Sequence, residues 1–91
     1  MSVKDTLTAK LSDRFTPAFL DVIDESMQHH GHAGWREGGE THFRVRIAAN
    51  HFAGMSRVAQ HRAIHEVLEA DLKGRVHALA IEVLPVEGPY V

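Results

Sequence analysis

Hydrophobic and polar residues follow different periods along the chain, and these periods predict the order of its elements. Near the N-terminus, apolar residues recur every four positions and so share one face of a helix: Val3, Leu7, Leu11. Ser2 followed three residues later by Asp5 resembles a capping box at the start of this helix, with Asp in place of Glu or Gln. Pro17 bounds its end, because the residue before a proline is pushed out of the helical region. We therefore expect a first helix at about residues 3–15.

Three later segments carry the pattern of strands. Residues 18–26 and 41–49 alternate between apolar and polar positions, as strands with one buried face do. In the second of them, the polar face consists of His42, Arg44, Arg46 and the apolar face of Phe43, Val45, Ile47. Residues 76–84 are apolar on both faces over their first half, which favours a central strand.

A second helix is predicted between the last two strands. Ser56 can cap its start, Lys73 lies near its end, and Gly74 stands where a C-terminal glycine belongs. One face of this helix carries His61, Ile64, His65, Leu68, Leu72. The order helix, strand, strand, helix, strand predicts an α+β domain with two helices on one face of a three-stranded mixed sheet. The first two strands should pair antiparallel, and the third should pair in parallel with one of them.

Composition sets limits on the class of protein. The 91 residues fit one domain, 1–91, with 44% hydrophobic and 24% charged residues. The tail, 86–91, is expected to be loose. No apolar run approaches the length that spans a membrane, and the first ten residues lack the apolar region of a secretory signal. With no cysteine in the chain, the cytoplasm is the expected location.

The arginines suggest one possible interface. The net charge of −2 argues against binding nucleic acid through bulk electrostatics. Residues 43–65 nevertheless contain four arginines and no carboxylate: Arg44, Arg46, Arg57, Arg62. These side chains could form a positive surface that binds DNA, or they could simply be solvated. Arg57 and Arg62 are the stronger candidates, because they lie near the start of the second helix, where its N-terminus favours phosphate.

Histidines are concentrated in the stretch HHGHAGWREGGETHFRV, residues 29–45, which holds four of the eight in the chain. Three interpretations compete: metal or cluster ligation, a nucleic-acid loop, and a solvated connection. The letters GHAG match the loop with which KH domains clamp nucleic acid, but that loop joins two helices and this one joins two strands. Imidazoles can ligate several transition metals, so the residues alone indicate only that a histidine pair could bind a metal.

Several motifs together resemble the BolA family. They are DES, GH and GGETHFRVRI, then HFAGMSRVAQHR, then VHALAI, in order over about residues 20–84. The resemblance implies a class II KH-like fold with an extra short helical turn near 50–54. It also implies a monothiol glutaredoxin as partner, with which family members share a [2Fe-2S] cluster. Some bacterial members are described as transcriptional regulators that bind DNA.

Carried over to this sequence, the family's loop ligand falls on His32 and its C-terminal ligand on His77. This loop is about one residue longer than in many relatives and adds further histidines, so His30 is an alternative to His32. His42 matches the histidine of the family's THF strand, as a weaker ligand candidate or a hydrogen-bonding neighbour, and His61 is expected to be structural. Two histidines can replace two cysteines on one iron.

The remaining ligands must then come from elsewhere, because this chain has no thiol. We expect a cysteine of the glutaredoxin and glutathione to supply them, and the free protein to be a colourless monomer that forms a heterodimer with its partner. From the residues alone, His77 is better interpreted as a buried core histidine, and the family resemblance is what favours ligation. No nucleophile stands in a recognisable setting, so an enzyme is not expected.

Overall fold

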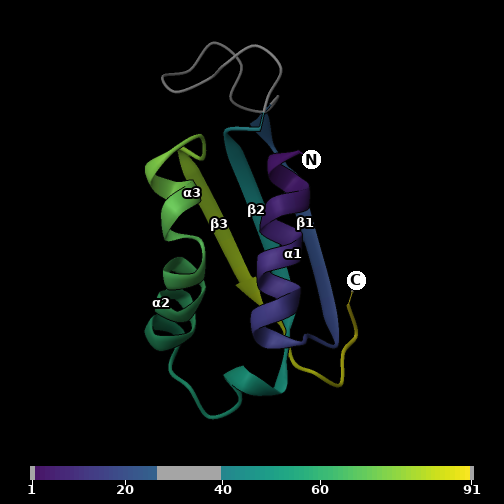
Figure 1. Cartoon of the computed structure of the whole chain (residues 1–91). Coiled ribbons are helices and arrows are strands. Elements are labelled where there is room, and N and C mark those ends of the chain that lie inside the picture. Colours follow the sequence, from purple (N-terminus) through teal and green to yellow (C-terminus); the bar gives the residue numbers. More distant parts are fainter. Residues whose placement is uncertain (1, 27–39, 91) are drawn as a thin grey trace.

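A computed structural model of the chain describes residues 2–26 and 40–90. Figure 1 shows the elements in chain order: α1 (Val3–Phe15), β1 (Phe19–Asp24), β2 (His42–Ala48), the 3₁₀ turn η2 (Asn50–Phe52), α2 (Arg57–Val67), α3 (Glu69–Lys73) and β3 (Ala78–Val83). The capping box at Ser2 and Asp5 is formed, and the second helix begins after its cap Ser56, as predicted. The short turn expected near 50–54 is η2.

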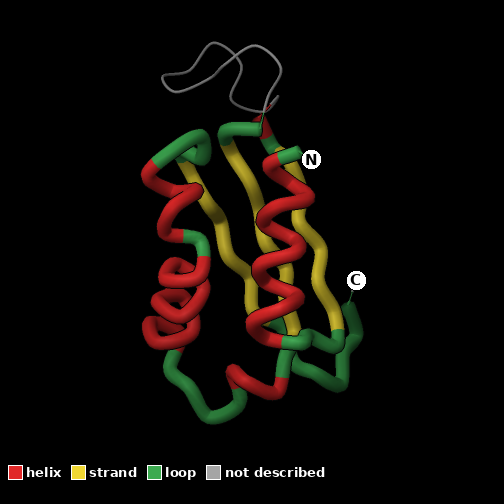
Figure 2. Tube along the Cα trace, in the orientation of Figure 1, coloured by secondary structure: helices red, strands yellow, loops and turns green. Residues whose placement is uncertain are grey.

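The three strands form one mixed sheet in the order β1-β2-β3. β1 pairs antiparallel with β2, and β2 pairs in parallel with β3, which confirms the predicted pairing. The helices lie on one face of this sheet, so the molecule has two layers (Figure 2). The predicted α+β class and the predicted arrangement of layers are therefore correct.

The predicted place of the third strand is wrong, because β3 is at the edge of the sheet and β2 is central. The apolar character of β3 has a different cause. Leu79, Ile81 and Val83 are half-buried against the core beneath the helices. On the other face, Ala78 is exposed and Ala80 is half-buried, so these two small apolar residues do not indicate burial. Only β2, with five of its seven residues buried, shows the burial of a central strand.

The second helix is interrupted at Leu68, which ends α2 and begins α3. The Leu68 side chain is buried, and its amide still donates to the carbonyl of Ile64 at 3.2 Å. Lys10 of α1 reaches Asp71 of α3 at 2.7 Å, which ties the two helical segments together. Among the described residues, no helix is long and apolar enough to cross a membrane.

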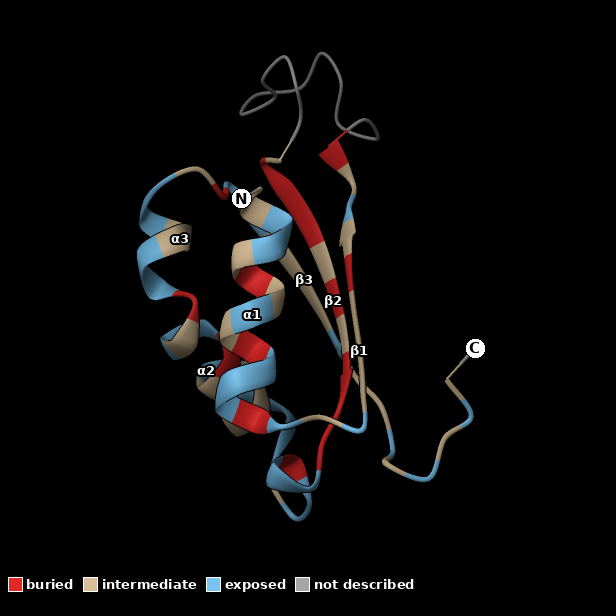
Figure 3. Cartoon of the chain, turned by 45° about the vertical axis from the view of Figure 1, so that its right-hand side comes forward, coloured by how far each residue is buried: buried red, intermediate tan, exposed pale blue. Residues whose placement is uncertain are grey.

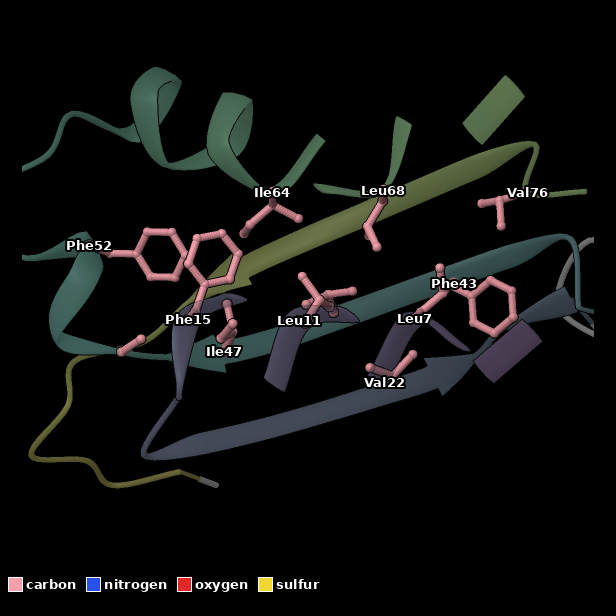
Figure 4. Packing of buried hydrophobic residues seen from close by; sticks show 12 residues of the cluster. Leu7, Leu11, Phe15, Val22, Phe43, Ile47, Phe52, Ile64, Leu68 and Val76 are labelled. Carbon is pink, nitrogen blue, oxygen red and sulfur yellow. The ribbon is translucent and has the colours of Figure 1, made fainter. Parts of the chain in front are cut away.

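The core lies between the helices and the inner face of the sheet (Figure 3). Its apolar side chains come from every layer, as Figure 4 shows, and the largest fully buried ones are Phe43, Leu7, Leu11, Ile47, Ile64, Leu68, Val45. These residues include Leu7 and Leu11 of the first helix and the three predicted apolar positions of the second strand, whereas Val3 is half-buried against the core. The periodicity therefore identified the buried face of both elements.

The C-terminal tail, which was expected to be loose, contacts the outer face of the sheet through Tyr90. The ring of Tyr90 stacks on that of Phe19 with 4.7 Å between centroids, and the guanidinium of Arg46 lies 5.7 Å from the centre of the Phe19 ring. The composition of the tail gave no signal for this contact.

Candidate functional site

Two histidines lie together at one end of the sheet. His42 is the first residue of β2, and His77 directly precedes β3, whose first residue Ala78 is opposite His42 in the parallel register. The backbone amide of His77 donates to the carbonyl of Thr41 at 2.7 Å. The two imidazole rings are nearly parallel, with centroids 6.3 Å apart and planes at 22°. Parallel pairing thus joins two histidines that are 35 positions apart in the sequence.

The two imidazoles differ in their exposure to solvent. His42 is 7% exposed, whereas His77 is an exposed residue. The reading of His77 as a buried core histidine is therefore wrong, because the residue lies before β3 begins rather than within it. An exposed imidazole can bind a metal or other group that a partner protein also contacts. His42 is held within the protein by its neighbours.

Residues 27–39 lie between β1 and β2 in the sequence and contain His29, His30 and His32; this histidine-rich segment connects to the same end of the sheet. β1 ends at Asp24, opposite Phe43, and β2 begins at His42, so the chain leaves and re-enters the sheet beside the histidine pair. His29, His30 and His32 lie outside the described residues, and their roles stay predictions. The ends of the segment, Ser26 and Glu40, are described.

A hydrogen-bonded cluster holds these two ends together. Asp24 accepts hydrogen bonds from the amide and hydroxyl of Ser26, at 2.9 and 2.6 Å, and from the amide of Glu40 at 3.1 Å. Burial alone would raise the pKa of Asp24. The hydrogen bonds from Ser26 and Glu40 and the charge of Lys4 outweigh it and lower that pKa below its ordinary value of 3.8.

Glu40 adds a link to the first helix. Its φ of 62° lies in the left-handed region, and its carboxylate accepts from the amide of Lys4 in the first turn of α1 at 3.2 Å. The unpaired amides of a helix N-terminus favour a negative group there. Sequence reasoning missed the roles of Asp24, Ser26 and Glu40, although the motifs DES and ETH place them directly at the two ends of the segment.

The Asp24 cluster makes a testable contribution to stability. Asp24→Asn should lower the free energy of unfolding by about 1 kcal/mol at neutral pH, since the hydrogen bonds lose their charged acceptor and solvent screens part of the effect. Because the folded-state pKa lies below the unfolded one, this stabilisation is present above pH 3.8 and is lost as the pH falls through the folded value.

Urea unfolding of the parent and of Asp24→Asn over a series of pH values measures this difference. Asp13→Asn, at an exposed position of α1, is the control and should change stability little at any pH. A deficit of Asp24→Asn that persists unchanged in acid would contradict a role for the ionised carboxylate.

The four predicted arginines belong to two different layers. Arg44 and Arg46 lie on the outer face of β2, where they pair with Glu25 at 2.8 Å and Glu82 at 3.4 Å. The hydrogen bond and charge of Glu25 raise the pKa of the Arg44 guanidinium. Arg57 and Arg62 are exposed on α2, in the helical layer. The absence of carboxylates from residues 43–65 therefore did not predict the partners of Arg44 and Arg46. Glu25 lies directly after β1, and Glu82 lies on β3.

The two histidines of α2 do not share one environment. His61 is half-buried and lines a hollow together with Ile81 and Val83 of β3, and its structural role stays a prediction. His65 is exposed, so the predicted grouping of this residue on one face with the buried Ile64 and Leu68 is wrong. Within residues 2–26 and 40–90, no group of three or more histidine or carboxylate side chains is placed to hold a metal ion.

Fold and site together define a small α+β domain that presents an exposed imidazole at the strand end where its histidine-rich segment begins. A profile described as BolA-like protein matches residues 11–87, and the chain belongs to the BolA family. It is 42% identical over 79 residues to the DNA-binding transcriptional regulator BolA of Vibrio cholerae, covering 87% of this chain and 71% of that protein. It is also 42% identical to mouse BolA-like protein 1, over 88% of this chain and 56% of that one.

Solved structures agree with this assignment. The BolA domain of SufE1 from Arabidopsis thaliana superposes with a TM-score of 0.83 at 39% identity, over 93% of each chain. The BolA1 structure from the same plant gives a TM-score of 0.81 at 36% identity, over 94% of this chain and 95% of that one. The fold and the family inferred from the sequence motifs are both confirmed.

Proposed function

We propose that this BolA-family chain is a non-catalytic adaptor that pairs with a monothiol glutaredoxin and contributes histidine ligands to a shared [2Fe-2S] cluster. The observation that carries the proposal is the exposed imidazole of His77 beside the ends of the segment that contains His30 and His32. The ligands from this chain would be His77 and one histidine of that segment, most simply His32.

The donor set of this chain fits a shared cluster and not a cluster of its own. A [2Fe-2S] centre takes four ligands, and two histidines replace two of the thiolates on one iron in Rieske-type centres. The chain has no cysteine, so the thiolates must come from the cysteine of the glutaredoxin and from glutathione. When bound, such a centre supplies one-electron redox chemistry at a potential that histidine ligation raises. We propose the cytoplasm as the location, since partner thiols stay reduced there.

Co-purification with the organism's monothiol glutaredoxin in the presence of glutathione tests the proposal. We expect the free chain to be a colourless monomer and the heterodimer to show visible absorption and circular dichroism of a cluster. The spectrum should differ from that of the glutaredoxin alone, because two of the ligands change. An unchanged glutaredoxin spectrum after addition of this chain would refute the adaptor function.

A second candidate function is direct binding of duplex DNA. It is supported by the name of the Vibrio relative and by the exposed positions of Arg57 and Arg62 on α2. Arg44 and Arg46 are also candidates, but their guanidinium groups already face carboxylates, so we expect them to contribute less.

Salt dependence provides the test of DNA binding. If Arg57 and Arg62 contact phosphates, each substitution by alanine should reduce the magnitude of the slope of log K for DNA binding against log salt concentration by about 1. It should also weaken binding to all DNA sequences alike. Arg44→Ala removes the same charge from the outer face, where the guanidinium already pairs with Glu25, so its effect on the slope should be smaller. Unchanged affinity of the Arg57→Ala/Arg62→Ala double variant would eliminate this surface.

A further inference from the structure

Three polar side chains are buried in the described part of the chain, and all three lie beside the candidate site: Ser26, Thr41, His42. The Ser26 hydroxyl contacts Asp24, and the Thr41 hydroxyl lies 2.8 Å from Nδ1 of His42. Because each group has a fixed number of donors and acceptors, the contacts determine where the protons are.

The hydroxyl group of Ser26 is fully used. Its proton must go to Oδ1 of Asp24 at 2.6 Å, since the ionised carboxylate only accepts. Its oxygen accepts from two backbone amides, that of Thr41 at 2.9 Å and that of His42 at 3.2 Å. A hydroxyl oxygen has two acceptor lone pairs, so both are occupied.

The hydroxyl proton of Thr41 then has one good acceptor. Ser26 Oγ is 3.4 Å away and has no lone pair left for it. His42 Nδ1 is at 2.8 Å, which is an ordinary distance for a hydroxyl donor. Thr41 Oγ1 is buried away from water, so leaving its proton unpaired would cost stability. Thr41 therefore donates, and Nδ1 of His42 accepts.

We infer that the chain Asp24–Ser26–Thr41 holds His42 as the neutral tautomer with its proton on Nε2. A metal ligand needs a nitrogen lone pair, and in this tautomer the Nδ1 lone pair is used by Thr41 while Nε2 carries hydrogen. His42 is then a hydrogen-bond donor beside His77 and not a ligand. In the proposed cluster, His42 is then a positioning residue whose Nε2–H donates to a cluster ligand or a sulfur. Only this consequence rests on the proposed function.

The tautomer is measurable in the free protein, without any partner or cluster. Long-range ¹H–¹⁵N NMR correlations of the histidine side chains at neutral pH should show Nδ1 of His42 in the unprotonated range and Nε2 in the protonated range. A protonated Nδ1 would overturn the inference. This result stands whether or not the proposed function is correct.

Variants at Thr41 test whether its hydroxyl sets the tautomer. Thr41→Val removes the donor and should move the two nitrogen shifts toward each other as both tautomers become populated. Thr41→Ser keeps the hydroxyl and should retain the parent pattern. Thr8→Val removes an exposed hydroxyl on α1 and is the control for a general effect. A folded Thr41→Val variant that keeps the nitrogen shifts of the parent would refute control of the tautomer by this hydroxyl. If Thr41→Val does not fold, the spectrum of the parent protein alone decides the tautomer.

The consequence for the complex is tested separately. In His42→Gln, the amide nitrogen can replace the Nε2 donor but not an imidazole ligand. We expect the complex of His42→Gln to keep a cluster spectrum and that of His77→Gln to lose it. Loss in His42→Gln and retention in His77→Gln would reverse the assignment. Absence of a cluster even with the parent chain would refute the proposed function and leave the tautomer result intact.

Discussion

Replacement of His77 by alanine should abolish the visible circular dichroism of the complex with a monothiol glutaredoxin. The reason is that an exposed imidazole is the ligand that this end of the sheet offers to a shared cluster, and the chain has no thiol to replace it. The fold should be unaffected, because the side chain is outside the core. The hydrogen bond from residue 77 to the carbonyl of Thr41 uses only the backbone.

The matched control is His65→Ala, which removes another exposed histidine, from α2. It should leave the spectrum and the lifetime of the cluster unchanged. His32→Ala should behave like His77→Ala. If His30 replaces His32 as a ligand, only the double variant His30→Ala/His32→Ala should lose the cluster spectrum. If the His77→Ala complex retained the spectrum and lifetime of the parent complex, His77 would have no role in ligation.

The sequence predicted most of the fold because its elements have strong local signals. The apolar spacing of α1 and the alternation of β2 depend on the helical and strand periods, and both are borne out by burial. The position of β3 in the sheet was not predictable in this way. An edge strand covered by a helix and a central strand can have the same apolar pattern, and only the pairing distinguishes them.

The site was predicted in part, for a similar reason. His77 and His42 could be singled out from the family motifs, but their contact depends on the parallel register of β2 and β3. The residues around Ser26 stand in the motifs DES and ETH, but their contact could not be predicted, because the two motifs lie on either side of a long connection. The break at Leu68 also had no signal, since neither glycine nor proline stands there.

The remaining large effect concerns the core that supports this site. Phe43→Ala should destabilise the protein by about 3–5 kcal/mol, because it removes a large aromatic side chain and leaves a cavity. Phe43 is 1% exposed, follows His42 on the central strand, and lies opposite Leu79 in β3. A domain of this size has a total stability of about 5–15 kcal/mol. We therefore expect a fall in Tm of at least about 12 °C.

Thermal unfolding followed by far-ultraviolet circular dichroism measures this effect, with Val58→Ala as the control. Val58 is a large hydrophobic residue that is 61% exposed, so its truncation should change stability by less than about 0.5 kcal/mol. At temperatures where Phe43→Ala is still folded, its histidine pair should be less ordered, because the cavity lies directly beneath the start of β2. A Tm of Phe43→Ala within a few degrees of the parent would mean that the core collapses around the missing ring and that this end of the sheet is less tightly packed than its burial indicates.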